Sequence, residues 1–368
     1  MTTLPPGPPP RPGERVEVAD LARFVDRIDV RSPAEFAEDH VPGAVNMPVL
    51  DDAERATVGT IYAKVSAFEA RKVGAALAAR NIARLVETYA HDKPPEWRPL
   101  VYCWRGGQRS GAVAHVLREI GWRAAQLAGG YRAYRRHVVA TLAAPLPPLD
   151  LRVVCGLTGS GKSRLIAALA AQGAQVLDLE QLARHRGSLL GDLPGDPQPG
   201  QKAFESALCD ALARIDPTRP VFVESESKRI GTLQVPDRLL DAMRDARCVK
   251  VEASRALRIA LLKDEYRHFL ADPDVLGERL ERLAPLHGRK TIQRWREAAL
   301  AGDFDTLVGE LLDLHYDPLY GRSIERNFPR HVDAQVASVA AVDDAAFHAL
   351  ASDVIASVAT REPETTPP

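Results

Sequence analysis

One cysteine stands in a setting that favours a reactive thiolate. Cys103 opens a loop between a buried strand expected over residues 99–102 and a helix expected over residues 110–120. Such a loop can aim backbone N–H groups and the positive end of the helix at the sulfur, and both stabilise a thiolate. The sequence therefore predicts a sulfur nucleophile, and a merely buried cysteine at a strand end is the less favoured alternative. The remaining loop residues are Trp104, Arg105, Gly106, Gly107, Gln108, Arg109 and Ser110.

A second loop has the pattern of a phosphate-binding site. Residues 156–163 fit GxxxxGK[ST], after a strand expected over 151–155 and at the start of a helix expected over 162–171. Glycines let backbone N–H groups surround a phosphate, while the lysine adds a charge and the serine hydroxyl can reach Mg²⁺. No nucleotide-base signature accompanies the loop, so it predicts a di- or triphosphate rather than ATP in particular. The expected diphosphate-binding residues are Gly156, Thr158, Gly159, Ser160, Gly161, Lys162 and Ser163.

Carboxylates at two later strand ends extend this second site. Asp178 ends a strand expected over 175–178, and Glu224 and Glu226 follow a strand expected over 220–223. Each could hold Mg²⁺ through water or orient a substrate group, and a solvated strand-end carboxylate is an equal alternative for each. No metal ligand is therefore certain, and a requirement for Mg²⁺ stays open.

Composition narrows the class of protein. The four cysteines among 368 residues show neither CxxC spacing nor a Cys/His metal pattern, so disulfides and zinc are not expected. No apolar run approaches the roughly 18 residues of a membrane helix, and the proline-rich start lacks the apolar core of a secretory signal. We expect a soluble, cytoplasmic protein without a membrane span, and the sequence predicts no oligomeric state.

Charge is unevenly distributed although the net charge is only −1. Between positions 98 and 140 the sequence contains eight arginines and a single acidic residue. This local basic field favours an anionic substrate, and a solvated arginine-rich face is an equal alternative. The residues are Arg98, Arg105, Arg109, Arg118, Arg123, Arg132, Arg135 and Arg136, against Glu119.

The elements that must position these loops form two α/β blocks. The expected strands span residues 27–30, 99–102, 151–155, 175–178, 220–223 and 248–251. The expected helices span residues 33–38, 72–89, 110–120 and 162–171, and from about residue 254 the chain is predicted to be largely helical. The predicted organisation is a disordered proline-rich tail at 1–14, a first α/β domain at 15–140, a linker at 141–150, a second α/β domain with a helical C-terminal part at 151–355, and a disordered tail at 356–368.

The first block resembles the rhodanese family. Its N-terminal signature matches residues 29–36 and 40–48, and its closing signature matches residues 127–134, with Tyr134 where many members carry tryptophan. The resemblance covers roughly residues 17–140 and implies a rhodanese-like fold in which Cys103 carries a persulfide or its selenium equivalent. It also implies that Asp29, Arg31, Glu35 and His40 tie together the loops around the site.

A rhodanese-like block followed directly by a phosphate loop resembles the tRNA 2-selenouridine synthase family. The resemblance extends to residues 58–62, 177–188, 201–205, 223–231 and 315–318, although Ser225 stands where an acidic residue is expected. It implies a P-loop NTPase-like second domain. It also implies conversion of 2-thiouridine at the tRNA wobble position into 2-selenouridine, in two steps. Geranyl diphosphate first alkylates the sulfur, and selenophosphate then supplies selenium as the S-geranyl group leaves.

The resemblance assigns roles to both loops. The phosphate loop would hold geranyl diphosphate, the loop from Trp104 to Ser110 would hold selenophosphate, and Arg132, Arg135 and Arg136 would contact tRNA. No tightly bound cofactor is expected, and an enzyme that supplies selenophosphate is a conceivable partner. One alternative is a rhodanese-type sulfurtransferase fused to an ATP-dependent small-molecule or nucleoside kinase. Another is a rhodanese domain that serves only as a docking module.

Overall fold

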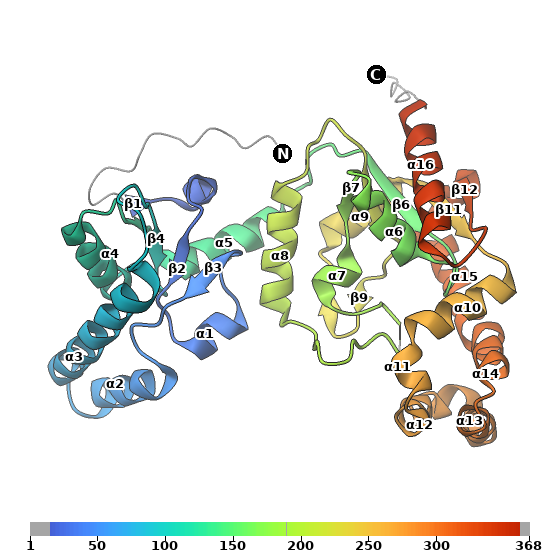
Figure 1. Ribbon diagram of the computed structural model, residues 1–368, viewed down its shortest axis with the longest axis horizontal. Coiled ribbons are helices and arrows are strands. Elements are labelled where there is room, and N and C mark those ends of the chain that lie inside the picture. Colours follow the sequence, from blue (N-terminus) through green and yellow to red (C-terminus); the bar gives the residue numbers. More distant parts are fainter. Residues whose placement is uncertain (1–14, 189, 361–368) are drawn as a thin grey trace. The chain divides into compact units, whose positions relative to one another are not determined.

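The computed structural model describes residues 15–188 and 190–360 (Figure 1). The tail predicted for residues 1–14 and the part of the second predicted tail from residue 361 onward lie outside these residues. The chain divides into two compact units. Of the described residues, the first unit contains 15–142 together with Gly200–Asp210, and the second contains those in Ala143–Pro199 and 211–360.

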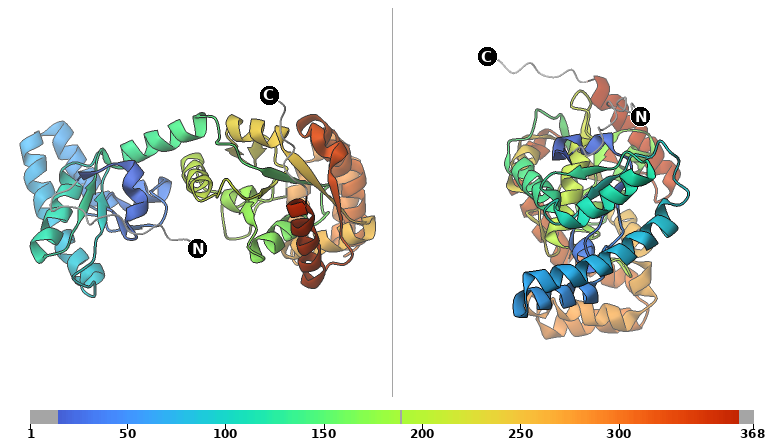
Figure 2. Two further views of the ribbon diagram at one scale, coloured as in Figure 1. Left: turned by 90° about the horizontal axis from the view of Figure 1, so that it is seen from above. Right: turned by 90° about the vertical axis from the view of Figure 1, so that its left-hand side faces the viewer.

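The first unit is built on a five-stranded parallel sheet. Its strand order is β1 (Arg15–Val16), β5 (Ala125–Leu127), β4 (Leu100–Tyr102), β2 (Arg27–Asp29) and β3 (Ala44–Asn46). The α-helices are α1 (Pro33–Glu38), α2 (Asp52–Lys64), α3 (Ala67–Leu85), α4 (Gln108–Ile120) and α5 (Gly130–Ala143). Helices α2 and α3 contact each other as a hairpin (Figure 2).

Local sequence signals account for several of these elements. The expected helix over 33–38 is α1, and Glu35 at its third position reaches back to the backbone of Ser32. The expected helix over 110–120 is α4, which ends at Gly121 in the left-handed conformation. The helix expected over 72–89 begins earlier, at Ala67, because the Ser66 hydroxyl accepts a hydrogen bond from the backbone of Glu69 at 3.1 Å.

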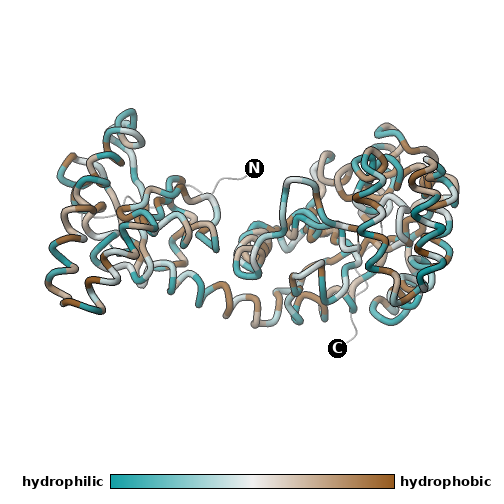
Figure 3. The backbone as a smooth tube through the Cα atoms, turned by 90° about the horizontal axis from the view of Figure 1, so that it is seen from below, coloured by the Kyte–Doolittle hydropathy of each residue, from teal (hydrophilic) through white to brown (hydrophobic). Residues whose placement is uncertain are grey.

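The second unit contains another five-stranded parallel sheet. Its order is β12 (Gln335–Ser338), β11 (Arg247–Glu252), β6 (Leu151–Cys155), β8 (Val221–Glu224) and β7 (Gln175–Leu177). Helices α6 (Lys162–Ala171) and α16 (Asp344–Thr360) pack together against this sheet, where Leu165, Ile166 and Phe347 are buried. Figure 3 shows hydrophobic and hydrophilic residues interspersed along the helices of the chain, as expected for helices that are buried on one side.

Most of the remaining chain of the second unit is helical. A buried cluster around Trp295, which is 1% exposed, holds the helices after β11 together. These helices are α10 (Arg255–Glu265), α11 (Arg267–Leu270), α12 (Pro273–Glu281), α13 (Ala284–Leu300), α14 (Phe304–Leu311) and α15 (Asp317–Asn327), with a π-helical turn at Leu312–Tyr316. Ahead of them lie α7 (Leu179–Ala183), the short hairpin β9 (Arg229–Ile230) and β10 (Leu233–Gln234), and α9 (Asp237–Asp245).

Four sequence-based boundaries need correction. Strand β12 interrupts the region predicted to be largely helical, because it pairs in parallel with β11. Helix α5 continues into the predicted linker as far as Ala143, since Leu142 is buried. Helix α16 continues past residue 355 to Thr360, since Val358 is buried. Helix α8 (Gln201–Ala213), placed by sequence in the second domain, lies largely in the first unit, where Ser206 donates a 3.0 Å hydrogen bond to Asp39.

Candidate active sites

Cys103 directly follows β4 and precedes α4, as the sequence predicts. Its side chain is 3% exposed, and the Ser110 hydroxyl donates a hydrogen bond to the sulfur at 3.2 Å. Burial raises the pKa of the Cys103 thiol. Hydrogen bonds from the Ser110 hydroxyl and from the backbone of Ser110, Gly107 and Arg105 nevertheless hold that pKa below its ordinary value. The loop therefore stabilises a thiolate.

A buried amide on the neighbouring strand β5 holds the cysteine loop in shape. The Gln126 side chain is 6% exposed and donates to the carbonyl oxygens of Gly106 at 2.8 Å and Gly107 at 3.0 Å, and to the Ser110 hydroxyl at 2.8 Å. Sequence reasoning missed this residue. The available signal was a polar side chain flanked by Ala125 and Leu127 in a short apolar stretch, where a buried amide needs partners.

The loop also passes very close to the start of α5. Gly106 and Gly130 both adopt the left-handed conformation, with φ of +63° and +57°. A Cβ atom on Gly130 would lie 2.2 Å from the carbonyl oxygen of Cys103 and 2.4 Å from the backbone nitrogen of Gly106. Glycine at this position is therefore required by the cysteine loop.

Gly130→Ala is expected to destabilise the first unit by at least about 2 kcal/mol, because it combines a strained φ with a backbone clash. Urea unfolding followed by circular dichroism measures the effect. The matched control is Gly59→Ala in α2, where a Cβ would meet no atom within 4 Å. This control should be neutral or slightly stabilising. Equal stability of the two variants would contradict the proposed packing.

The other predicted loop residues divide into exposed and paired groups. Arg105 and Gln108 are exposed, whereas Arg109 forms a 3.4 Å ion pair with Glu35. The Trp104 ring is half-buried, with its centroid 5.3 Å from that of Tyr131, so it packs within the unit. Arg105 is thus the cation that an incoming anion meets at the surface of the loop.

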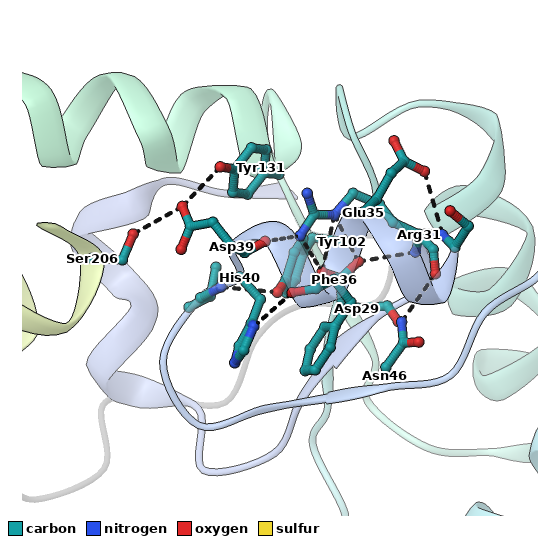
Figure 4. A network of polar contacts seen from close by, with 12 residues as sticks. Asp29, Arg31, Glu35, Phe36, Asp39, His40, Asn46, Tyr102, Tyr131 and Ser206 are labelled. Carbon is teal, nitrogen blue, oxygen red and sulfur yellow. Dashed lines mark hydrogen bonds and ion pairs between the residues drawn. The ribbon is translucent and has the colours of Figure 1, made fainter. Parts of the chain in front are cut away.

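A buried polar network lies beside this loop (Figure 4). Arg31 is 1% exposed, donates to both carboxylate oxygens of Asp29 and lies 3.9 Å from the Tyr131 ring centroid. The Tyr131 hydroxyl donates to Asp39 at 2.8 Å, and the Asn46 amide donates to the carbonyl oxygens of Asp29 and Arg31, both at 3.0 Å. These contacts confirm the expectation that Asp29 and Arg31 tie the surrounding loops together.

The three arginines expected to contact tRNA lie on α5 but are not equivalent. Arg132 and Arg136 are exposed. Arg135 is half-buried, forms an ion pair with Glu205 and donates to the carbonyl oxygen of Lys202 at 3.3 Å. Arg135 therefore holds α8 against α5, whereas Arg132 and Arg136 present their charge to solvent.

In the second unit, the phosphate loop connects β6 to α6. Gly159 and Gly161 adopt φ of +75° and +90°. Close approach also favours glycine here, since a Cβ on Gly161 would lie 2.6 Å from the Phe347 ring. Lys162 donates to the carbonyl oxygens of Gly156 at 2.9 Å and Leu157 at 3.3 Å, within its own loop. A phosphate can take over this ammonium group, because a charge-assisted bond to phosphate is stronger than one to a neutral carbonyl.

A polar pocket of about 260 Å³ opens onto this loop. Its wall includes three cationic side chains, Lys162, Arg164 and Arg186, and three carboxyl groups, those of Glu180, Glu226 and Glu265. Opposite charges close together suit an anionic ligand that brings either a cation or protons with it. Sequence reasoning did not single out Glu180, Arg164 or Arg186, and the available signal for Glu180 was its position just after the strand ending near Asp178.

The three carboxylates predicted from sequence have different surroundings. Asp178 caps α7, where it accepts from the backbone of Gln181 at 2.7 Å. Glu224 is 1% exposed and accepts from the backbone of Leu179 at 3.1 Å. Glu226 lines the pocket. The structure thus brings Glu226 to the phosphate loop and gives Asp178 and Glu224 contacts with α7.

The donor set near Ser163 fits Mg²⁺ bound together with a phosphate. The Ser163 hydroxyl lies 2.8 Å from a carboxylate oxygen of Glu180. Mg²⁺ at phosphate sites commonly takes one or two protein oxygens, with water and phosphate oxygens completing its shell. Residues 15–188 and 190–360 contain no group of three or more His, Cys, Asp or Glu side chains arranged to hold a metal by themselves. In the same residues, no helix is both long and apolar enough to span a membrane.

The pocket makes stability depend on pH. Burial raises the pKa of Glu226 to about 8, and the negative charge of Glu180 acts in the same direction while Lys162 opposes it. Between the ordinary pKa of 4.5 and this value, the folded chain keeps a proton that the unfolded chain releases. The free energy of unfolding therefore falls as pH rises through this interval.

Glu226→Gln is expected to reduce the fall in the free energy of unfolding with pH by up to about 1.4 kcal/mol per pH unit, because one titrating proton is removed. Urea unfolding of the wild type and the variant at several values between about pH 5 and pH 8 measures the difference. The variant should gain stability relative to the wild type as pH rises. Parallel curves would show that Glu226 does not titrate in this way.

Two protein-family models match this chain, one over each of its α/β domains. Residues 17–137 match the rhodanese-like domain family, and residues 149–274 match the tRNA 2-selenouridine synthase AAA domain family. The tRNA 2-selenouridine synthase of Nitrosomonas europaea is 36% identical over 265 residues, which are 70% of this chain and 67% of that protein. The enzyme of the same name from Alcanivorax borkumensis is 33% identical over 329 residues, 81% of this chain and 89% of that protein. A solved rhodanese-related protein from Thermoplasma volcanium covers 33% of this chain and 91% of its own, at 16% identity and a TM-score of 0.22.

Fold and sites together define a two-domain α/β protein in which a rhodanese domain with a thiolate-stabilising loop precedes a P-loop domain with a helical C-terminal part. Neither loop alone distinguishes a sulfurtransferase from a kinase or a hydrolase. The match extends well beyond both loops. The chain belongs to the tRNA 2-selenouridine synthase family.

Proposed function

We propose that this protein converts 2-thiouridine at the wobble position of tRNA into 2-selenouridine, in two chemical steps. The observation that carries the proposal is the presence, in one chain of this family, of a cysteine loop that stabilises a thiolate and a phosphate loop beside a pocket lined by cationic and carboxylate side chains. The two loops suit two different anions, and the proposed reaction uses two, geranyl diphosphate and selenophosphate.

The first step is assigned to the P-loop domain. A thiocarbonyl sulfur is a poor leaving group until it is alkylated. The sulfur of 2-thiouridine attacks the geranyl carbon, a C–S bond forms, and the C–O bond to diphosphate breaks. The negative charge grows on the departing pyrophosphate, where Lys162 and the N–H groups at the start of α6 stabilise it. Mg²⁺, when bound by Ser163 and Glu180, would supply further positive charge to the pyrophosphate.

The second step is assigned to the rhodanese domain. Cys103 is the nucleophile that attacks the phosphorus of selenophosphate, and Arg105 and Arg109 supply positive charge for the phosphate group. A Cys103 S–P bond forms, the P–Se bond breaks, and selenide is released. Selenide then attacks C2 of the base, so that a C–Se bond forms and the C–S bond to the departing geranyl thiolate breaks, and water later cleaves the S–P bond on Cys103 to release phosphate. The exposed Arg132 and Arg136 suit the phosphate backbone of tRNA, and an enzyme that makes selenophosphate is the expected source of the donor.

The purified protein and a tRNA that carries 2-thiouridine at the wobble position provide the test, with nucleoside mass spectrometry as the readout. Geranyl diphosphate alone should yield the S-geranyl nucleoside, and the addition of selenophosphate should yield 2-selenouridine. ATP together with a nucleoside or another small-molecule acceptor should yield no phosphorylated product, in contrast to the kinase alternative. The proposal fails if thiolated tRNA remains unchanged with both donors present.

A further inference from the structure

A second cavity lies beside the phosphate loop. It has a volume of about 50 Å³, and its wall is almost entirely apolar. The lining residues Leu262 and Phe269 belong to α10 and α11. Leu276 belongs to α12, and Val308 and Leu311 belong to α14. All of these elements belong to the helical part of the second unit.

The apolar cavity and the polar pocket share part of their walls. Thr158, Leu262 and Tyr266 line both. Thr158 belongs to the phosphate loop itself, and its hydroxyl is buried without a hydrogen-bond partner among residues 15–188 and 190–360. The two cavities are therefore adjacent, and the phosphate loop lies at their boundary.

The chemistry of the apolar wall restricts what part of a ligand can lie in this second cavity. The Tyr266 hydroxyl lies 3.2 Å from the Ser188 hydroxyl, and the unpaired Thr158 hydroxyl lies at the phosphate loop, so the rest of the cavity offers few partners to a polar ligand. A purine base and a ribose placed here would bury polar groups without partners, which is unfavourable. A hydrocarbon chain removes its own apolar surface from water and leaves no polar group unpaired.

We propose that this cavity is the binding site for the hydrocarbon chain of a prenyl diphosphate whose diphosphate lies on the phosphate loop. The inference rests on the proposed function for the identity of the ten-carbon chain. Leu276, Leu307 and Leu311 wall the cavity on the side of α12 and α14. These walls bound the length of chain that the cavity accepts, so geranyl diphosphate is expected to bind better than the fifteen-carbon farnesyl diphosphate.

Isothermal titration of the full chain with inorganic pyrophosphate, geranyl diphosphate and farnesyl diphosphate tests this site. Val308 is half-buried on the wall, and Val308→Phe fills the cavity. This variant should keep its affinity for pyrophosphate and lose at least about tenfold in affinity for geranyl diphosphate, since burial of two CH₂ groups alone is worth that factor. Leu270→Ala enlarges the cavity and should improve binding of farnesyl diphosphate relative to geranyl diphosphate.

Val275→Phe is the matched control, because this valine on α12 is 39% exposed and lies outside the wall. It should bind all three ligands as the wild type does. Unchanged pyrophosphate affinity in Val308→Phe also shows that the second unit is folded. The inference is overturned if the wild type binds geranyl diphosphate no more tightly than pyrophosphate, or if Val308→Phe weakens both ligands equally or neither. A further outcome is that geranyl diphosphate binds tightly and in a Val308-dependent way, but its geranyl group is not transferred to thiolated tRNA. This outcome would contradict the proposed first step and would still support the apolar site.

Discussion

Cys103→Ser is expected to abolish selenium incorporation and to leave geranylation of thiolated tRNA largely intact. A serine hydroxyl at this position stays protonated near neutral pH, whereas the hydrogen bonds that lower the pKa of Cys103 act on a thiol that is already more acidic. Loss of a covalent nucleophile typically reduces a rate by at least about 1,000-fold. The readout is the 2-selenouridine formed from S-geranylated tRNA and selenophosphate, measured by nucleoside mass spectrometry.

The matched control for this variant is Cys209→Ser. Cys209 is a buried cysteine of the same unit, and burial raises the pKa of its thiol. This control should retain both activities. Full selenium incorporation by Cys103→Ser would contradict the assigned role and favour the alternative in which the rhodanese domain serves only for docking.

Lys162→Ala is expected to slow geranylation by about 100- to 1,000-fold, since it removes a preorganised positive group from the departing pyrophosphate. It should also weaken binding of inorganic pyrophosphate, which titration measures directly. The same variant should still convert tRNA supplied already S-geranylated into 2-selenouridine, because that step belongs to Cys103. The two variants thus fail at opposite steps.

Lys290→Ala is the control for charge removal, because Lys290 is exposed on α13 of the same unit. It should geranylate tRNA at the rate of the wild type. If Lys162→Ala geranylates normally, the phosphate loop is not the site of the first step. If both Cys103→Ser and Lys162→Ala retain 2-selenouridine in cellular tRNA, the proposed function itself is wrong.

The sequence by itself determined the two reactive loops and their flanking elements. The strand at Leu151–Cys155 and the helix at Lys162–Ala171 have the predicted bounds, and Cys103 stands between the predicted strand and helix. These features are local. Each of these signals depends only on consecutive residues: a short apolar run, a glycine pattern or a helix start. They can therefore be recognised without the rest of the chain.

Only the tertiary structure decided which distant side chains complete each site. It placed Gln126 of β5 on the cysteine loop, and it put Glu180 and Glu226 in the phosphate pocket while Glu224 bonds to the backbone of α7. Which side chains meet at a site depends on strand order and on burial between segments far apart in sequence. A carboxylate at a strand end has the same local pattern whether it faces a ligand or a helix.

The apolar cavity is the clearest case of this limit. Its wall combines the phosphate loop with residues of α10, α11, α12 and α14, and the longer of these helices carry the ordinary apolar spacing of packed helices. That spacing predicts which helix residues are buried, but it does not predict where the packed helices leave a cavity. A cavity exists only where the packed volumes of several helices fail to fill the space between them, which is a property of the assembled fold.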